Sequence, residues 1–283
     1  MERHQRGVRP TVEQLIKSVR GVKVGYSITN NDASETMVFL HGFTGSMKTW
    51  EPIIKCLPST VRCIAVDLLG HGKTDAPQET QRYEMKEQLL DLQALFVSLQ
   101  VTDFTLVGYS MGGRIALAYA LTYPKHVRRL MLESASPGLQ LVTEQQARLK
   151  ADETLAKKIE VEGLPAFIDF WQDIPLFQSQ KKLSDLKQQA IRQERLQQSS
   201  LGLASSLKEM GTGSQPSYWS QLNELKIPVT LITGEFDEKF QLIAQQMKNR
   251  IANSQHLEVL AVGHAIHVEN PVQFATIIME QVK

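Results

Sequence analysis

The sequence has few of the residues that build disulfide frameworks and metal clusters. Its two cysteines, Cys56 and Cys63, cannot form such a framework or complete a four-ligand zinc site. No run of about 18 apolar residues is present, and the polar first ten residues lack the apolar segment of a signal peptide. These absences predict a cytoplasmic protein without a membrane anchor.

An excess of charge of one sign is also absent. The 31 Lys and Arg residues nearly balance the 30 Asp and Glu residues, which leaves a formal net charge of +1. Proteins that bind nucleic acid or anionic membranes concentrate basic residues on one surface, where these residues neutralise phosphates. We therefore expect neither nucleic acid nor a membrane as a partner.

Glycine-rich nucleotide loops are incomplete. Residues 42–49 end as a phosphate-binding loop does, but Met47 occupies a required glycine position. Residues 72–74 also end correctly, yet Asp67 stands where the first glycine is needed. No G-x-G-x-x-G follows a predicted strand, and no cluster of His, Cys and carboxylates has the spacing of metal ligands. We expect neither a cofactor nor a metal.

What the sequence does contain is an alternation of short apolar runs with longer helical patterns. The apolar runs predict strands buried on both faces at residues 37–40, 61–66, 104–107, 130–132, 229–233 and 257–260. Apolar residues at spacings of three and four predict helices at residues 84–99, 112–122, 238–251 and 271–282. This order predicts an α/β fold with a mostly parallel sheet flanked by helices.

The alternation stops between about residues 138 and 215, where only helical patterns occur. The strand pattern resumes at Ile227, so the helical segment is predicted to be inserted within one domain, over the carboxyl end of the sheet. The predicted division is an N-terminal extension at residues 1–22, a core at residues 23–137 and 216–283, and a helical lid at residues 138–215.

The strongest chemical motif surrounds Ser110. The segment Gly108-Tyr109-Ser110-Met111-Gly112 fits the G-x-S-x-G pattern, directly after a predicted strand and directly before a predicted helix. Such a pattern predicts a sharp turn that exposes the serine hydroxyl at the N-terminus of the helix, where the helix dipole favours a developing anion. The motif alone is common by chance, so the other motifs of the chain decide whether Ser110 is interpreted as catalytic.

Two later loops provide partners for Ser110. Asp237 and His264 each follow a predicted strand, and the chain order Ser, Asp, His is that of α/β-hydrolases. His264 would take the proton of Ser110, and Asp237 would hold the imidazole in the required tautomer. Glu235 in place of Asp237 and His267 in place of His264 remain as alternatives, less favoured by their positions in the loops.

An oxyanion hole is predicted from two backbone amides, those of Phe43 and Met111. Phe43 follows the predicted strand at residues 37–40, where this fold supplies one of the amides, and Met111 follows Ser110. The imidazole of His41 is predicted to be buried and hydrogen-bonded in a structural role. Asp67 is interpreted as a turn residue.

Together these motifs resemble the α/β-hydrolase superfamily from about residue 22 onward. A second set of segments resembles the MenH-type 2-succinyl-6-hydroxy-2,4-cyclohexadiene-1-carboxylate (SHCHC) synthases of menaquinone biosynthesis. These segments are residues 109–114, 132–138, 148–156, 170–171, 175–177, 192–195, 211–219 and 234–240. Most of them lie in the predicted lid, which selects the substrate in this fold.

The narrower resemblance implies a lyase. The implied reaction is proton abstraction followed by elimination of pyruvate from 2-succinyl-5-enolpyruvyl-6-hydroxy-3-cyclohexene-1-carboxylate, which gives SHCHC. Ser110 paired with His264 would act as the base, although a nucleophilic role fits the sequence equally well. A carboxylic-ester or carbon–carbon-bond hydrolase with the same triad stays open as the alternative, and the oligomeric state stays open as well.

The resemblance also implies a small polycarboxylate as the substrate. Carboxylates suit arginine, and Arg114, Arg148 and Arg195 match positions of the family pattern. Arg114 lies four residues after Ser110, on the same face of the predicted helix. Tyr109 and Trp171 are expected to offer an O–H and an N–H group to the substrate.

Overall fold

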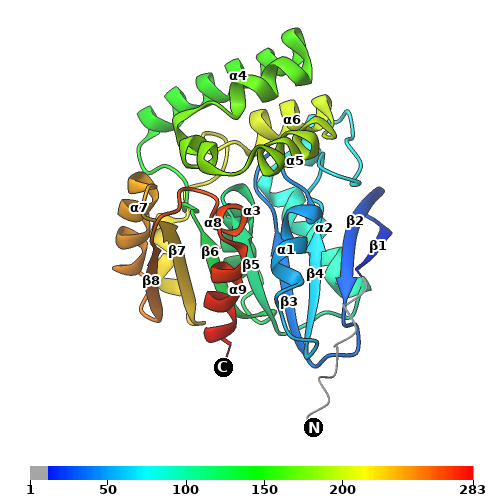
Figure 1. Ribbon diagram of the computed structural model, residues 1–283, viewed down its shortest axis with the longest axis vertical. Helices are drawn as coiled ribbons and strands as arrows, with labels where there is room; N and C mark the ends of the chain where they lie inside the picture. The colour runs from blue at the N-terminus through cyan, green and yellow to red at the C-terminus, as the bar shows by residue number, and fades with distance from the viewer. Residues whose placement is uncertain (1–11, 283) are drawn as a thin grey trace.

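The fold is built on a single twisted sheet that carries helices on both faces. A computed structural model describes residues 12–282 of the chain, and eight strands of this part form the sheet (Figure 1). The strands are β1 (Glu13–Val19), β2 (Val22–Thr29), β3 (Glu35–Leu40), β4 (Val61–Val66), β5 (Phe104–Tyr109), β6 (Val127–Glu133), β7 (Val229–Gly234) and β8 (Ser254–Val259). Their order in the sheet is β1-β2-β4-β3-β5-β6-β7-β8.

Most neighbouring strands run parallel. β2 is antiparallel to both of its neighbours, and every pair from β4 to β8 is parallel. The predicted α/β fold with a mostly parallel sheet is therefore confirmed. The strands predicted from apolar runs are present, with β8 beginning three residues earlier than expected because this edge strand is only partly buried.

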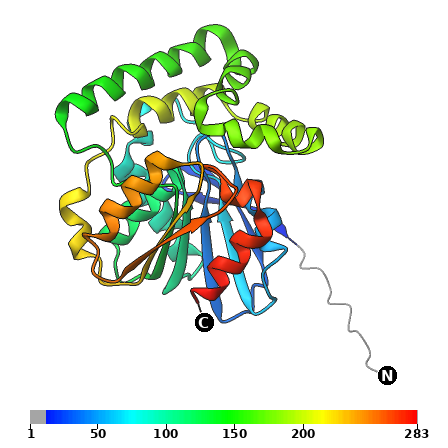
Figure 2. The same ribbon diagram turned by 60° about the vertical axis from the view of Figure 1, so that its left-hand side comes forward.

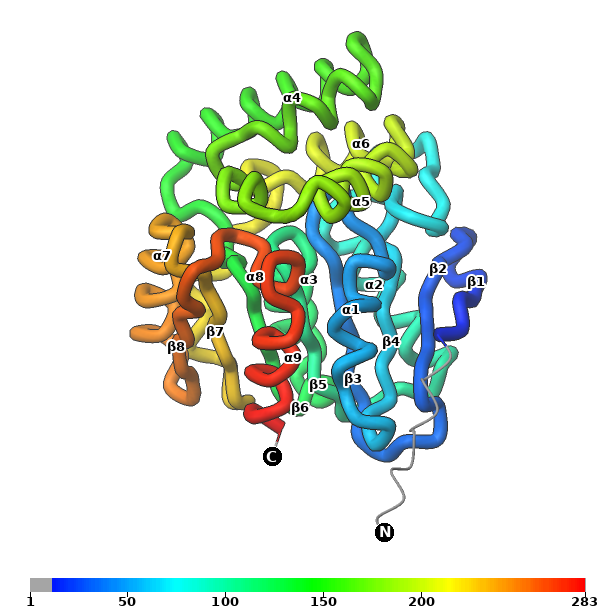
Figure 3. The backbone as a smooth tube through the Cα atoms, in the orientation of Figure 1, coloured from blue at the N-terminus to red at the C-terminus, as the bar shows by residue number. Residues whose placement is uncertain are grey.

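The core forms two apolar layers, one on each face of the sheet. Successive residues of a strand point to opposite faces, so Leu106 of β5 packs into one layer and Val107 into the other. The first layer contains α2 (Met85–Ser98), α3 (Met111–Thr122) and α7 (Glu238–Lys248), and the second contains α1 (Glu51–Ile54) and α9 (Pro271–Glu280). Figure 3 shows α1 and α9 in front of the sheet.

The predicted N-terminal extension at residues 1–22 is wrong for residues 13–22, and residues 1–11 lie outside the described part. β1 and β2 form a hairpin in which Val19 pairs with Val22 and both turn residues, Arg20 and Gly21, have positive φ. β1 escapes prediction because it is an edge strand whose residues are mostly exposed, so it lacks an apolar run.

The predicted helical insertion lies between β6 and β7. It contains α4 (Val142–Trp171), η3 (Pro175–Lys182), α5 (Asp185–Leu196) and α6 (Ser200–Met210). Figures 1 and 2 both show these green to yellow elements beyond the carboxyl ends of the parallel strands. α4 bends at Gly163, which has a φ of 81°. Beyond the bend, Phe167 and Ile168 pack against α6.

Short elements complete the described part of the chain. They are η1 (Met47–Trp50), η2 (Thr80–Tyr83), η4 (Trp219–Glu224) and α8 (Ile266–Glu269). Within residues 12–282, no helix has the length and apolar character needed to cross a lipid bilayer.

The close approach of α3 to the end of β3 depends on Gly112. A Cβ atom at this position would overlap with the carbonyl oxygens of Leu40 and His41. The start of α3 can therefore lie directly on the β3 backbone only because residue 112 has no side chain.

Replacing Gly112 with alanine tests this contact. The added methyl group has to displace backbone atoms, so we expect the free energy of unfolding to fall by about 1–3 kcal/mol, as at other overpacked sites. Urea denaturation followed by circular dichroism measures this loss. An unchanged denaturation midpoint would contradict the close approach of α3 to β3.

Candidate active site

Ser110 occupies a strained turn between β5 and α3. Its backbone has a φ of 49° and a ψ of −108°, and its N–H donates to the carbonyl oxygen of Glu133 at 2.9 Å. A non-glycine residue in such a conformation costs about 1–3 kcal/mol and persists only where the surrounding structure holds it. The turn leaves the hydroxyl group of Ser110 at the wall of a cavity.

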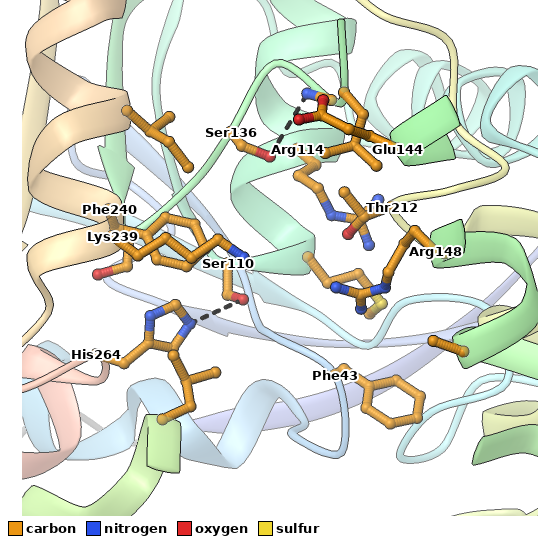
Figure 4. Close-up of a pocket in the computed structure, with 18 of the residues that line it drawn as sticks. Phe43, Ser110, Arg114, Ser136, Glu144, Arg148, Thr212, Lys239, Phe240 and His264 are labelled. Atoms are coloured by element: carbon orange, nitrogen blue, oxygen red, sulfur yellow. Dashed lines mark hydrogen bonds between the residues drawn. The ribbon is translucent and has the colours of Figure 1, made fainter. Parts of the chain in front are cut away.

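Ser110, His264 and Asp237 form a continuous hydrogen-bonded chain. Nε2 of His264 lies 3.1 Å from Oγ of Ser110 (Figure 4). Nδ1 of His264 lies 2.7 Å from Oδ2 of Asp237. His264 and Asp237 are both buried. Because Nδ1–H donates to the carboxylate, Nε2 is left to accept the hydroxyl proton of Ser110.

The alternative partners of Ser110 lie elsewhere. Glu235 is exposed and accepts a hydrogen bond from the backbone N–H of Ala261 at 2.7 Å. His267 is buried against Glu133, with 2.8 Å between its Nδ1 and a carboxylate oxygen. The structure thus brings together Ser110, Asp237 and His264 and keeps both alternatives away from the serine.

The loop that carries Phe43 is held by two buried side chains. Nδ1–H of His41 donates to the carbonyl oxygen of Gly42 at 2.8 Å, and Nε2 accepts from Leu68 N–H at 3.0 Å. Burial lowers the pKa of His41 to about 4, so the imidazole is neutral at pH 7. The carboxylate of Asp67 accepts from the N–H groups of Met47 and Lys73, at 2.6 and 2.7 Å.

The amides predicted for the oxyanion hole are available. Within residues 12–282, neither the Phe43 nor the Met111 N–H donates to another backbone or side-chain group. Met111 opens α3, where N–H groups have no partner inside the helix. Phe43 and Met111 both line the cavity that contains Ser110.

The cavity has a volume of about 1120 Å³ and opens between the core and the inserted helices. It is lined by the catalytic candidates Ser110 and His264, together with side chains of α3, α4, α7 and the connecting loops. Of the predicted substrate-binding residues, those that line it are Tyr109, Arg114, Arg148 and Trp171.

Arg114 is a buried cation at the wall of this cavity. Its Nη1 donates to the carbonyl oxygen of Met210 at 2.9 Å and to Oε1 of Gln215. Within residues 12–282, no carboxylate lies within ion-pair distance of its guanidinium. Desolvation, followed by the nearby charge of Arg148, lowers its pKa to about 10. Arg114 is still charged at pH 7, and the nearby Asp152, whose charge partly opposes this lowering of the pKa, is paired with Arg148 instead.

Arg148 lies partly exposed on α4. Its Nε donates to Oδ1 of the buried Asp152 at 2.8 Å, which fixes the stem of the guanidinium near Arg114. Trp171, at the other end of α4, packs edge-on against Phe43 with 5.3 Å between the ring centroids. The indole Nε1 is buried and has no hydrogen-bond partner among the described residues.

Arg195 lies apart from the other two arginines. It lines a smaller adjoining cavity of about 220 Å³, and Phe43, Tyr109 and Phe177 line both cavities. Its guanidinium lies 4.8 Å from the ring centroid of Phe177, and its Nη1 is buried without a partner among the described residues. The structure therefore does not bring Arg195 and Arg114 together in one cavity.

Sequence patterns do not single out the aromatic surroundings of His264. The rings of Phe240, Tyr109 and Phe177 lie 4.6, 5.4 and 6.2 Å from the imidazole, measured between centroids. Figure 4 shows Phe240 and Lys239 of α7 beside Ser110 and His264. Both α7 residues lie in segment 234–240, which carries part of the resemblance, so this segment was the available signal.

Comparison with known proteins gives consistent matches. The model of the α/β hydrolase fold family matches residues 35–271. A protein of Bacillus subtilis (strain 168) assigned as a 2-succinyl-6-hydroxy-2,4-cyclohexadiene-1-carboxylate synthase is 45% identical over 92% of this chain and 94% of its own length. The synthase of that name from Enterobacter sp. (strain 638) is 30% identical over 84% of this chain and 88% of its own length.

A solved structure is also similar. MenH from S. aureus superimposes with a TM-score of 0.86 and is 36% identical, with 90% of this chain and 96% of that chain covered. The similarity therefore extends over the core and the inserted helices together.

The buried histidines predict a loss of stability at acid pH. Burial lowers the pKa of His41 to about 4 and that of His71 to about 3, whereas both bind protons near pH 6.5 when unfolded. The unfolded state therefore binds more protons below pH 6.5, and stability falls as the pH falls. Between pH 6.5 and 5 we expect a loss of about 2 kcal/mol per histidine.

Urea denaturation at several pH values measures this loss. His71→Gln should reduce the slope of stability against pH by about one proton. This reduction distinguishes the contribution of His71 to the slope from that of the buried carboxylates. Equal slopes for wild type and His71→Gln would refute the assignment.

Proposed function

This chain belongs to the α/β-hydrolase superfamily and to its SHCHC synthase family, and we propose that Ser110, His264 and Asp237 carry out the pyruvate-eliminating reaction. The chain is a lyase of menaquinone biosynthesis, as its relatives are named SHCHC synthases. Its substrate is 2-succinyl-5-enolpyruvyl-6-hydroxy-3-cyclohexene-1-carboxylate. A cytoplasmic location is part of the proposal, because this substrate and pyruvate are both water-soluble anions.

The reaction moves one proton and breaks one carbon–oxygen bond. A base removes the proton from ring carbon 2, which lies next to the succinyl ketone. The electron pair forms a double bond between carbons 2 and 3, and the existing double bond shifts to carbons 4 and 5. The bond from carbon 5 to the enolpyruvyl oxygen breaks, and the departing enolate takes up a proton to become pyruvate.

Ser110 acts as the base in this proposal. Its Oγ receives the proton from ring carbon 2 while Nε2 of His264, 3.1 Å away, receives the hydroxyl proton. The carboxylate of Asp237 stabilises the imidazolium that forms, through the 2.7 Å contact with Nδ1. No bond forms between Ser110 and the substrate, so no acyl-enzyme is expected.

The oxyanion hole serves this reaction as it serves acyl transfer. Negative charge develops on the succinyl ketone oxygen as the proton leaves ring carbon 2. The N–H groups of Phe43 and Met111 are proposed to donate to that oxygen. One such donor contributes about 2.7–4 kcal/mol of transition-state stabilisation in other enzymes. The preorganised amides thus favour the enolate over the ketone.

The observation that carries the proposal is the buried charge of Arg114 in the same cavity as Ser110, which no carboxylate among the described residues contacts directly. A buried cation without a directly paired anion is unfavourable, and a substrate carboxylate supplies that anion. Arg148, held by Asp152, is proposed to contact the same end of the substrate. A neutral ester would leave the charge of Arg114 without a directly paired anion, which favours the lyase over the alternative hydrolase.

The inserted helices, within residues 138–215, are proposed to act as a lid over the cavity. Arg195 of α5 is then available to a second carboxylate that reaches the adjoining cavity past Phe43 and Tyr109. The partnerless Nη1 of Arg195 and Nε1 of Trp171 support contacts of both residues with a polar substrate. Tyr109 is proposed to offer its O–H where the two cavities meet.

Substitutions within the triad test the proposed mechanism. Ser110→Ala should abolish pyruvate release and leave the thermal midpoint nearly unchanged, because the hydroxyl adds little to packing. Asp237→Asn should reduce kcat by up to about 10⁴-fold through the wrong imidazole tautomer, as in a serine protease. Pyruvate is measured by coupling its release to lactate dehydrogenase.

Glu235→Gln is the matched control for Asp237→Asn. It removes a carboxylate two residues away, on the exposed side of the same loop, and should leave turnover unchanged. A severe loss in Glu235→Gln together with a mild one in Asp237→Asn would reverse the assignment of the acid. Detection of an acyl-Ser110 species by mass spectrometry during turnover would exclude the role of Ser110 as a base.

Arg114→Gln tests the carboxylate contact. A charge-assisted hydrogen bond contributes about 1.5–3 kcal/mol, so kcat/KM should fall about 10- to 150-fold, with KM raised. The partly exposed lid residue Arg192, which pairs with Asp169, provides the control Arg192→Gln, in which kcat/KM should be unchanged. Slow hydrolysis of p-nitrophenyl acetate should not change in Arg114→Gln. Equal losses with both substrates would mean that Arg114 only supports the fold.

A further inference from the structure

A second carboxylate–histidine pair lies beneath the proposed triad and takes no part in the reaction as described. Glu133, the last residue of β6, and His267 of α8 are both fully buried. The carboxylate oxygens of Glu133 lie 2.9 and 2.8 Å from Nδ1 of His267, and one of them also accepts the His267 backbone N–H at 3.1 Å. Glu133 thus holds both the ring and the backbone of His267.

Glu133 also contacts the turn that carries Ser110. Its carbonyl oxygen accepts the N–H of Ser110 at 2.9 Å, while its side chain binds the loop that contains His264 three residues before His267. The N–H of the next residue, Ser134, donates to the carbonyl oxygen of Ile232 in β7 at 3.0 Å. The end of β6 is therefore hydrogen-bonded to the Ser110 turn, to the His264 loop and to the strand that leads to Asp237.

Packing restrains the same histidine. The imidazole of His267 stacks on Trp50 with 4.6 Å between centroids and meets the ring of Tyr109 edge-on at 4.5 Å. The centroid of the Tyr109 ring also lies 5.4 Å from that of the His264 imidazole. A displacement of His267 would therefore be transmitted to His264 both through the short loop and through Tyr109.

We propose that Glu133 and His267 are positioning residues that hold His264 Nε2 at hydrogen-bonding distance from Ser110 Oγ. The inference rests on the proposed function only in taking Ser110 and His264 as the reacting pair. A misplacement of about 1 Å in a catalytic group can lower a rate about 10²-fold. Glu133 lines neither cavity, so its removal should affect kcat rather than substrate binding, whereas His267 also lines the adjoining cavity beside Arg195.

The experiment compares Glu133→Gln, Glu133→Ala and His267→Gln with wild type. Two rates are measured on folded protein: pyruvate release, resolved into kcat and KM, and phosphonylation of Ser110 by an alkyl fluorophosphonate. In the second reaction Ser110 Oγ bonds to phosphorus, fluoride leaves and His264 takes the hydroxyl proton. This rate depends on the Ser110–His264 geometry whatever the natural substrate is.

We expect kcat and the phosphonylation rate to fall at least about tenfold in Glu133→Ala and His267→Gln, with KM changed by less than about twofold in Glu133→Ala, because Glu133 lines neither cavity. Glu133→Gln keeps the shape and one acceptor for His267 Nδ1–H, so it should retain more of both rates than Glu133→Ala.

Asp91→Asn is the matched control. Asp91 is another buried carboxylate. It lies on α2, away from the catalytic loops, and is paired with Arg20 and Arg82. It should lower the thermal midpoint as Glu133→Gln does and leave both rates of the folded protein near wild type. Losses in Asp91→Asn equal to those in the Glu133 variants would show that stability alone is involved and would overturn the proposal.

Two further results would also overturn it. One is wild-type phosphonylation and kcat in both Glu133→Ala and His267→Gln. The other is failure of all three variants to fold at 20 °C, which would make the pair a requirement of the fold and nothing more. Wild-type protein that is phosphonylated but releases no pyruvate contradicts the proposed function, while the phosphonylation rates of the variants still decide the positioning role.

Discussion

The turn at Ser110 is the constraint on which the rest of the site depends. β5 ends and α3 begins within one residue, and the positive φ of Ser110 is tolerated because its neighbours are held on both sides. Gly112 lets α3 lie directly on β3, and Gly108 lets the turn lie against the backbone of Gly112 and Gly113. Without these contacts, the hydroxyl would not face His264 across 3.1 Å.

Charge and burial divide the site into two functional halves. Around the triad, the rings of Tyr109, Phe177 and Phe240 pack near the buried imidazole of His264. Toward the inserted helices, the buried Arg114 and the tethered Arg148 concentrate positive charge in the same cavity. In the proposed binding mode, the carboxylates of the polyanionic substrate meet these cations while its acidic C–H bond faces Ser110.

The two halves are contributed by different parts of the chain. Strand ends of the core supply Ser110, Asp237 and His264, whereas the insertion supplies Arg148, Trp171 and Arg195. Contacts between Glu194 of α5 and the hydroxyls of Ser46 and Thr49 join the insertion to the loop that carries Phe43. The substrate-binding side chains are thereby held in register with the proposed oxyanion amides.

The sequence by itself determined the features that depend on local patterns. Continuous apolar runs indicate strands buried on both faces, and the glycines around Ser110 indicate a tight turn between strand and helix. Parallel strands carry the loops that follow them to the same edge of a sheet, so the order Ser110, Asp237, His264 already predicted their convergence. The insertion was visible because helical periodicity replaced the strand pattern over a long stretch.

Only the tertiary structure decided what depends on contacts between distant segments. β1 is an edge strand of mostly exposed residues, so pairing with β2 defines it and hydrophobicity does not. The separation of Arg195 from Arg114 follows from how α5 packs against Phe177, which no spacing in the sequence reveals. The pairing of Glu133 with His267 joins residues 134 positions apart, and its hydrogen bonds offset a desolvation cost that exists only in the folded chain.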